Sequence, residues 1–370
     1  MATVTQPTVL IIDDEAGPRD ALKVILRPFF TIRSAENAKS ALDVLNHEPI
    51  DLITLDQRLP DRHGLDLLTD IKHEYPDVEV VIVTGYGSLK SAMEGIRQGA
   101  AGYLLKPFNV TELITLTQQT MDKKRRLDFL RRQLRSSPEL WELSEQSVQV
   151  WDSIKSKYFT LSQAVGPNAV SHEKEMSLVP LLSDILDATD RHLLNHSSRV
   201  SFYATLMAAR LNLTLSEQKC LAMGAFLHDI GKTSLPAYRF SEDQILPSGE
   251  PVVCREHCER GARLATTLGL PKDVHDIIAY HHERWDGYGY PSSLSGADIP
   301  ILARIVGIAQ AFDHLTADAP GRTFMSAEAA IQRISLSSGS HFDPQLLDAF
   351  LDVAKQSIAS LPTMAASPAA

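Results

Sequence analysis

Histidine residues are concentrated in one part of this 370-residue chain, and seven of the thirteen lie between positions 192 and 282. Imidazole nitrogens, combined with carboxylate oxygens, are ligands that first-row transition metals prefer in proteins. A single histidine is more often a hydrogen-bonded core residue than a ligand, but this clustering predicts a metal site. The predicted ligands are His196, His228, Asp229, His257, His281 and His282.

The chemistry of such a site depends on Asp229, because one carboxylate can bridge two metal ions. Two ions can activate a hydroxide for in-line attack on a phosphorus atom and can stabilise the leaving oxygen. Lys232 lies one turn after Asp229 and could neutralise the charge of a bound phosphate. The segment therefore predicts a phosphohydrolase site whose catalytic residues are Asp229 and Lys232.

A second group of polar residues follows the apolar runs of the N-terminal part. Asp13 and Asp14 end the first run, Asp56 the third and Thr84 the fourth, and Lys106 follows the fifth. In an open parallel sheet the carboxyl ends of the strands line one crevice, so these side chains should meet there. Three carboxylates close together invite a hard cation such as Mg²⁺, and the lysine and the hydroxyl can hold phosphoryl oxygens. This arrangement suits phosphoryl transfer onto Asp56.

The elements that must position these residues differ between the two parts of the chain. Short apolar runs alternate with amphipathic patterns up to about residue 110, which predicts a parallel sheet with helices on both faces. The predicted strands are 9–13, 29–34, 51–56, 78–84 and 102–106, and the predicted helices are 16–27, 37–47, 64–74, 88–98 and one that starts at Asn109. Later patterns are helical almost throughout. The predicted fold is multidomain, with a doubly wound, flavodoxin-like α/β domain followed by an all-α domain.

A helical connector is expected between these two domains. It carries Leu127, Leu130 and Leu134 at helical spacing, which favours a coiled coil and hence a homodimer. The expected segments are the α/β domain at 1–121, the connector at 122–177, the helical metal-binding domain at 178–360 and a disordered tail at 361–370.

Composition excludes several classes of protein. The net charge is −10, so the chain as a whole is a poor binder of DNA. No apolar run approaches the roughly 18 residues that a membrane span needs, and no secretion signal is evident. The three cysteines cannot form a disulfide framework and suit a reducing cytoplasm. Cys254 and Cys258 flank His257 and could supply thiolate to a metal, although helix packing is the commoner role of such residues.

The N-terminal part resembles the receiver domains of response regulators. The resemblance is carried by VLIIDDE (9–15), LITLDQRLPDRHGLDLL (52–68), VIVTGYGS (81–88) and GYLLKPF (102–108). It implies that a sensor histidine kinase is the phosphodonor partner. The residues that it implies are Asp13, Asp14 and Asp56 at Mg²⁺, Asp56 as phosphoacceptor, and Thr84, Tyr103 and Lys106 as switch residues.

The helical part resembles the HD-GYP family of cyclic di-GMP phosphodiesterases. The resemblance rests on HSSRV (196–200), LHDIGK (227–232), HCERG (257–261), HHERWDGYGYP (281–291), IPILARI (299–305), AFDHLT (311–316) and FDP (342–344). It implies two or three iron or manganese ions and hydrolysis of cyclic di-GMP to pGpG, with GMP as a further product. With the receiver domain, it predicts control of this hydrolysis by phosphorylation of Asp56. The implied substrate-binding residues are Lys232, Gly289, Tyr290, Pro291 and Arg322.

Three positions depart from the HD-GYP pattern. Gln310 stands where that family usually has an aspartate ligand, His192 where it often has a glutamate, and Ala319 where it has an arginine that holds the dinucleotide. Gln310 is a neutral and weaker oxygen donor, whereas His192, one turn before His196, could chelate the same ion. Asp313 is expected to be structural. These departures leave a second hypothesis open, in which the domain binds a nucleotide or a partner protein without hydrolysis.

Overall fold

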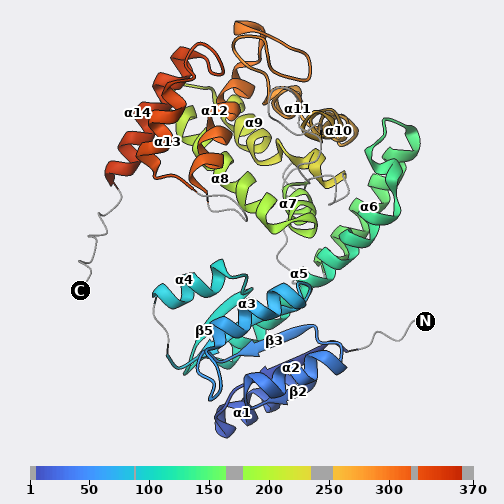
Figure 1. The fold of residues 1–370 in the computed structure, drawn as a ribbon. Coiled ribbons are helices and arrows are strands. Elements are labelled where there is room, and N and C mark those ends of the chain that lie inside the picture. Colours follow the sequence, from blue (N-terminus) through green and yellow to red (C-terminus); the bar gives the residue numbers. More distant parts are fainter. Residues whose placement is uncertain (1–5, 87–88, 164–177, 235–252, 318–323, 361–370) are drawn as a thin grey trace. The chain divides into compact units, whose positions relative to one another are not determined.

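The computed structural model describes residues 6–86, 89–163, 178–234, 253–317 and 324–360 (Figure 1). Its main boundary between two compact units falls between Arg126 and Leu127. We call the first the N-terminal unit and the second the helical unit, and each is described by itself. The expected tail and residues 164–177 of the expected connector lie outside the described residues.

The N-terminal unit is built on one parallel sheet with the strand order β2-β1-β3-β4-β5. Its strands are β1 (Thr8–Ile12), β2 (Thr31–Ala35), β3 (Leu52–Leu55), β4 (Glu79–Thr84) and β5 (Gly102–Leu105). Its helices are α1 (Ala16–Leu26), α2 (Ala38–His47), α3 (Gly64–Glu74), α4 (Leu89–Arg97) and the start of α5 (Val110–Ser136). The doubly wound α/β fold that the sequence predicts is confirmed.

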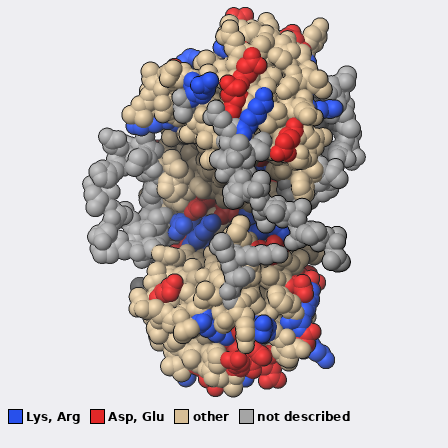
Figure 2. All heavy atoms as spheres, turned by 90° about the vertical axis from the view of Figure 1, so that its left-hand side faces the viewer, with Lys and Arg blue, Asp and Glu red and all other residues tan. Residues whose placement is uncertain are grey.

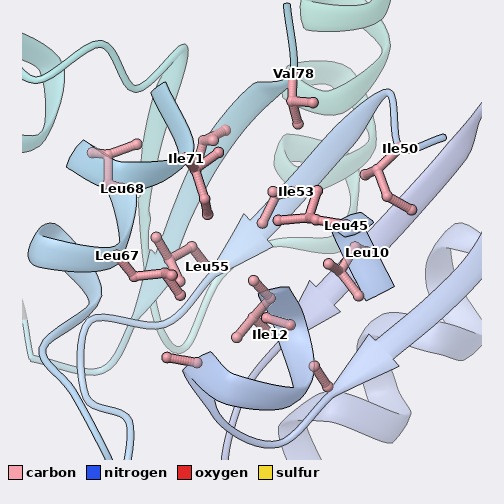
Figure 3. Close-up of a cluster of buried hydrophobic side chains, with 14 of the residues drawn as sticks. Leu10, Ile12, Leu45, Ile50, Ile53, Leu55, Leu67, Leu68, Ile71 and Val78 are labelled. Carbon is pink, nitrogen blue, oxygen red and sulfur yellow. The ribbon is translucent and has the colours of Figure 1, made fainter. Parts of the chain in front are cut away.

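Two hydrophobic clusters cover the two faces of the sheet. Neighbouring strand residues alternate between them, because successive side chains of a strand point to opposite faces. Leu10 belongs to the cluster that includes Leu45 of α2 and side chains of α3 (Figure 3). Val9 belongs to the other cluster, with Leu22 of α1 and Leu113 of α5. Helices on both faces explain why the strands are apolar on both sides.

The helical unit has no β-strand among its described residues, which confirms the all-α prediction. α8 packs against α9 and α12 (Figure 1). α10 packs against α11 and the short helix η2. Its elements after α5 are η1 (Pro138–Trp141), α6 (Glu145–Gln163), α7 (Leu178–Thr189), α8 (Arg191–Arg210), α9 (Leu215–Leu227), η2 (Ile230–Ser234), α10 (Val253–Thr267), α11 (Lys272–Tyr280), η4 (Gly296–Asp298), α12 (Ile301–Thr316), α13 (Ala327–Ser335) and α14 (Pro344–Ser360).

The C-terminal part of α5 is packed inside the helical unit. Leu127 and Leu130 are 2% and 0% exposed, and Arg131 Nε donates to the Ala188 carbonyl oxygen of α7 at 3.1 Å. Residues 127–160 therefore group with the helical unit, whereas the sequence assigns 122–177 to a connector. Leu127 and Leu130 are thus buried within the chain, and the expected homodimer stays a prediction. A stripe at helical spacing fits an intramolecular core as well as a coiled coil, and the sequence pattern does not distinguish them.

The surface carries charges of both signs. On the face drawn in Figure 2, acidic and basic side chains are interspersed over the described residues, and neither sign covers it. Of the helices that the structure describes, none is both long enough and apolar enough to span a membrane.

Candidate functional sites

The acidic residues at the carboxyl ends of the strands meet in one pocket of the N-terminal unit. Ligand oxygens of Asp13, Asp14 and Asp56 lie within 4.8 Å of one another. Lys106 Nζ donates to Asp13 Oδ2 and to Asp56 Oδ2, both at 2.6 Å. Thr84 Oγ1 donates to Asp56 Oδ1 at 2.8 Å. The parallel strands β1, β3, β4 and β5 thus bring all five predicted residues together.

Burial and ion pairing shape the charges of this pocket. Burial raises the pKa of Asp13, although the contact with Lys106 opposes it. Burial would lower the pKa of Lys106, but its bonds to Asp13 and Asp56 raise it, so the ammonium stays charged. The Tyr103 hydroxyl lies 3.5 Å from Oε1 of Gln57, the residue after Asp56. A phosphoryl group on Asp56 would therefore meet a cation and a hydroxyl that are already in place.

The predicted metal ligands of the helical unit come from separate helices and converge on Asp229. His196 lies on α8, and His228 directly follows α9 and precedes Asp229. His257 lies on α10, and His281 directly follows α11. These helices converge because α8 packs on α9, while α10 packs on α11 and on η2, the turn that follows Asp229.

One oxygen of Asp229, Oδ2, faces the first pair of imidazoles. It lies 3.4 Å from His228 Nε2 and 3.6 Å from His196 Nε2, and these two nitrogens are 3.2 Å apart. His228 Nδ1 donates to the Ala225 carbonyl oxygen at 2.7 Å, and His196 Nδ1 donates to Asp313 Oδ2 at 2.7 Å. With both rings neutral, each Nε2 would direct its lone pair toward the other Nε2 and toward a carboxylate oxygen. A cation among these three atoms would remove their repulsion.

The other oxygen of Asp229, Oδ1, faces a second group of donors. It lies 3.2 Å from His257 Nε2 and 3.8 Å from His281 Nε2, and it is buried without a hydrogen-bond partner. His281 Nδ1 donates to a backbone carbonyl of α11 at 3.0 Å, so its Nε2 also offers a lone pair. Ligand atoms of His257, Cys258, His281 and His282 lie within 4.8 Å of one another. This donor set fits two cations that share Asp229.

Burial keeps the imidazoles of His228, His281 and His282 neutral, whereas Asp229 stays charged. Burial lowers the pKa of His228 to about 4 and brings the pKa values of His281 and His282 well below the ordinary value. Burial alone would raise the pKa of Asp229, but Lys232, with Nζ 2.5 Å from Oδ2, and His228 hold it well below its usual range. Neutral imidazoles and an ionised carboxylate are the states in which these groups bind a metal.

Asp313 on α12 has a more specific role than the structural one that the sequence predicts. Its Oδ2 accepts the bond from His196 Nδ1, and Arg199 Nε donates to its Oδ1 at 2.5 Å. Burial would raise the pKa of Asp313, but His196 and Arg199 lower it. The carboxylate therefore fixes the ring of His196 with Nε2 toward Asp229. The packing of α8 on α12 creates this contact, and no spacing in the sequence indicates it.

Two glycines allow η2 to approach α10 closely. A Cβ atom on Gly231 would lie 1.9 Å from the His257 carbonyl oxygen. A Cβ atom on Gly261 would lie 2.7 Å from the Ile278 side chain and 3.2 Å from the Gly231 nitrogen. A larger residue at either position would separate Asp229 from His257, so these glycines help to assemble the centre.

The loop of predicted substrate-binding residues, 289–291, packs against His282. The Tyr290 ring stacks on that of His282, with 4.6 Å between ring centroids, and Tyr290 is only 4% exposed. Gly289 is buried too, and a Cβ atom there would lie 2.3 Å from the Arg284 nitrogen. Pro291 follows Tyr290 through a cis peptide bond. The Tyr290 ring therefore helps to orient His282, and the substrate contact of this loop stays a prediction.

Gln310 lies on α12, between residues that contact the histidine cluster. Gly307 lies one turn earlier on α12, and a Cβ atom added there would lie 3.1 Å from the His281 carbonyl oxygen. Asp313 lies one turn later and contacts His196. Gln310 is 5% exposed, and its Oε1 is buried without a hydrogen-bond partner. A buried amide oxygen without a partner is available as a neutral ligand, so Gln310 remains a candidate ligand.

His192 and Ala319 are the other positions that depart from the family pattern. His192, one turn before His196 on α8, is exposed and lies outside the described groups of potential ligands. Arg322, the predicted substrate contact, and Ala319 lie outside the described residues.

Two family models match the chain. Residues 9–118 match the response regulator receiver domain, and residues 180–346 match the HD domain. The acidic pocket lies in the first match and the histidine centre in the second. The protein is therefore a response regulator in which a receiver domain precedes an HD domain.

Three curated relatives extend this comparison. "Probable cyclic di-GMP phosphodiesterase" of Vibrio cholerae is 29% identical over 95% of this chain and 78% of its own length. "Cyclic di-GMP phosphodiesterase response regulator RpfG" of Xanthomonas campestris is 28% identical over 93% of this chain and 86% of its own length. "3'3'-cGAMP-specific phosphodiesterase 2" of Vibrio cholerae is 32% identical over 49% of this chain and 35% of its own length. The first two alignments span both domains.

Proposed function

We propose that this protein hydrolyses cyclic di-GMP at a centre of two divalent metal ions, and that phosphorylation of Asp56 controls the reaction. The observation that carries the proposal is the placement of Asp229, whose two oxygens face two separate groups of histidine nitrogens. The names of two relatives support the choice of substrate. The expected product is linear pGpG, with GMP as a further product.

Residues of the HD domain would hold the two ions. His196, His228 and Asp229 Oδ2 would form the first position, and His257, His281 and Asp229 Oδ1 would belong to the second. Fe²⁺ or Mn²⁺ is the expected metal, because both accept mixed nitrogen and oxygen ligands. Bound there, two such ions supply Lewis-acid activation of water and of the phosphate oxygens.

Lys232 would assist binding of the phosphodiester. Its Nζ holds Asp229 Oδ2, and 23% of its side chain is exposed. An ammonium at the edge of a buried metal centre can neutralise the charge of an incoming phosphate. Lys232 would thus orient Asp229 and also contact the substrate.

The receiver pocket supports control by a sensor histidine kinase. Mg²⁺ held by Asp13, Asp14 and Asp56 would assist phosphoryl transfer, and the new charge on Asp56 would rearrange its contacts with Thr84 and Lys106. α5 starts in the N-terminal unit and continues without a break to Ser136 in the helical unit. It is the covalent route by which a change in the receiver domain would reach the HD domain. Phosphotransfer and nucleotide hydrolysis would take place in the cytoplasm.

The proposal is tested on the full-length protein by combining metal analysis with product analysis. After reconstitution with Fe²⁺ or Mn²⁺, we expect about two ions per chain in the HD domain and conversion of cyclic di-GMP to pGpG. 3′3′-cGAMP is assayed beside it, because one relative is named for that substrate. Fewer than about one ion per chain, with no pGpG formed, would contradict the proposal.

Nucleotide binding without hydrolysis is the second candidate function, and Gln310 is the observation that favours it. Its neutral amide replaces a charged ligand, so metal would bind less tightly at this centre. In this case a metal-loaded protein would retain cyclic di-GMP in equilibrium dialysis and release no product.

Gln310→Asp is expected to increase both metal occupancy and the rate of hydrolysis. A buried carboxylate is costly without a cation but favourable beside one. The variant should therefore be less stable than the wild type without metal, and metal should stabilise it more. Urea unfolding followed by tryptophan fluorescence measures this, because all three tryptophans lie after residue 140. Gln310→Leu is the uncharged control, and an unchanged or lower rate in Gln310→Asp would show that the amide itself is a working part of the site.

A further inference from the structure

The second group of donors around Asp229 contains a sulfur atom. Cys258 on α10 is 0% exposed, and its Sγ lies 3.5 Å from His257 Nε2. The Sγ atom is also within 4.8 Å of the ligand nitrogens of His281 and His282. The corresponding group on the other side of Asp229 contains only nitrogen and oxygen atoms.

A second observation indicates that this group surrounds a cation. Asp229 is 0% exposed, and its Oδ1 points at this group without accepting a hydrogen bond. His281 Nε2, 3.8 Å away, directs a lone pair to the same space, because Nδ1 carries the ring proton. Acceptor atoms that face one another in a buried space repel unless a positive charge lies between them.

We propose that Cys258 supplies a sulfur ligand to the metal position formed by His257, His281, His282 and Asp229 Oδ1. When a metal binds there, the thiol releases its proton to solvent and a metal–sulfur bond forms. Thiolate is a soft ligand, so this position would select Zn²⁺, Fe²⁺ or Co²⁺ over Mn²⁺ and Mg²⁺. The metal position on the Oδ2 side has only nitrogen and oxygen ligands, so it would accept a broader range of divalent metals. This inference rests on the proposed metal centre and makes its two positions chemically different.

The test is the absorption spectrum of the full-length protein reconstituted with Co²⁺. A thiolate bound to Co²⁺ gives a charge-transfer band in the near ultraviolet, which imidazole and carboxylate ligands do not give. We expect the band in the wild type, in Cys220→Ser and in Cys254→Ser, and we expect its loss in Cys258→Ser. In competition experiments, the preference for Zn²⁺ over Mn²⁺ should fall roughly tenfold or more in Cys258→Ser.

A double variant tests the proposal even if Cys258→Ser does not fold. Cys220→Ser combined with Cys254→Ser leaves Cys258 as the only thiol of the chain, so a charge-transfer band in this protein identifies the ligand without altering it. A protein that binds Co²⁺ in the HD domain without the band overturns the role of Cys258 and leaves the metal centre intact. A protein whose HD domain binds no Co²⁺ overturns both this inference and the proposed function.

Discussion

Asp229→Asn is expected to abolish both metal retention and hydrolysis of cyclic di-GMP. The substitution keeps the size of the side chain but removes the charge that would attract both ions and replaces one bridging oxygen with an NH₂ group, which has no lone pair for a metal. Because each ion contributes several kcal/mol to transition-state stabilisation, we expect the rate to fall about a thousandfold or more. Metal content per chain and the rate of pGpG release measure the two effects.

A buried aspartate outside the centre provides the control for this substitution. Asp276 on α11 is 9% exposed and is paired with His275 and Lys272, so Asp276→Asn also removes a buried carboxylate beside a histidine. It should keep its metal and its activity. If Asp229→Asn retained two ions and near wild-type hydrolysis, Asp229 would not be the bridging ligand and the proposed function would lose its main support.

Asp56→Asn is expected to prevent phosphorylation of the protein. Asp56 lies beside Lys106 and Thr84, and an amide oxygen at this position is too weak a nucleophile to accept the phosphoryl group. Incorporation of phosphate from a small-molecule phosphodonor should fall to background, a loss of roughly a hundredfold or more. Phosphate-affinity gel electrophoresis of the full-length protein measures it.

Asp61→Asn is the control within the receiver domain. The Asp61 carboxylate accepts backbone hydrogen bonds from Ala38 and Lys39, both at 3.0 Å, at the start of α2. This variant should still be phosphorylated. Hydrolysis is then compared with and without the phosphodonor, and the rate should change in the wild type and in Asp61→Asn but not in Asp56→Asn. A phosphorylated Asp56→Asn protein would mean that another residue is the acceptor.

The fold of the N-terminal unit follows closely from local patterns in the sequence. Strands such as Leu52–Leu55 are short apolar runs between amphipathic helices, and this alternation permits few topologies. The carboxyl ends of parallel strands lie at one edge, so Asp13, Asp56 and Thr84 could be predicted to meet. The structure brings them within hydrogen-bonding or ion-pairing distance of one another or of Lys106.

The apolar stripe of α5 shows where a local pattern is ambiguous. Leu127 and Leu130 have the spacing of a coiled coil, and the sequence contains nothing that identifies the surface they cover. The structure buries them within one chain, beside α7. The same pattern satisfies both arrangements, since burial of apolar area does not depend on which helix provides the partner surface.

Residue types and spacing alone determined which groups of this protein are able to do chemistry: a phosphoacceptor with its cation and hydroxyl, and a set of histidines around one aspartate. Only the tertiary structure decided which oxygen of Asp229 faces which histidines, that Asp313 orients His196, and that Cys258 Sγ lies beside His257 Nε2. Metal ligation and hydrogen bonding depend on separations of a few ångströms between atoms far apart in the chain. Those separations result from helix packing, to which every residue of the interfaces contributes.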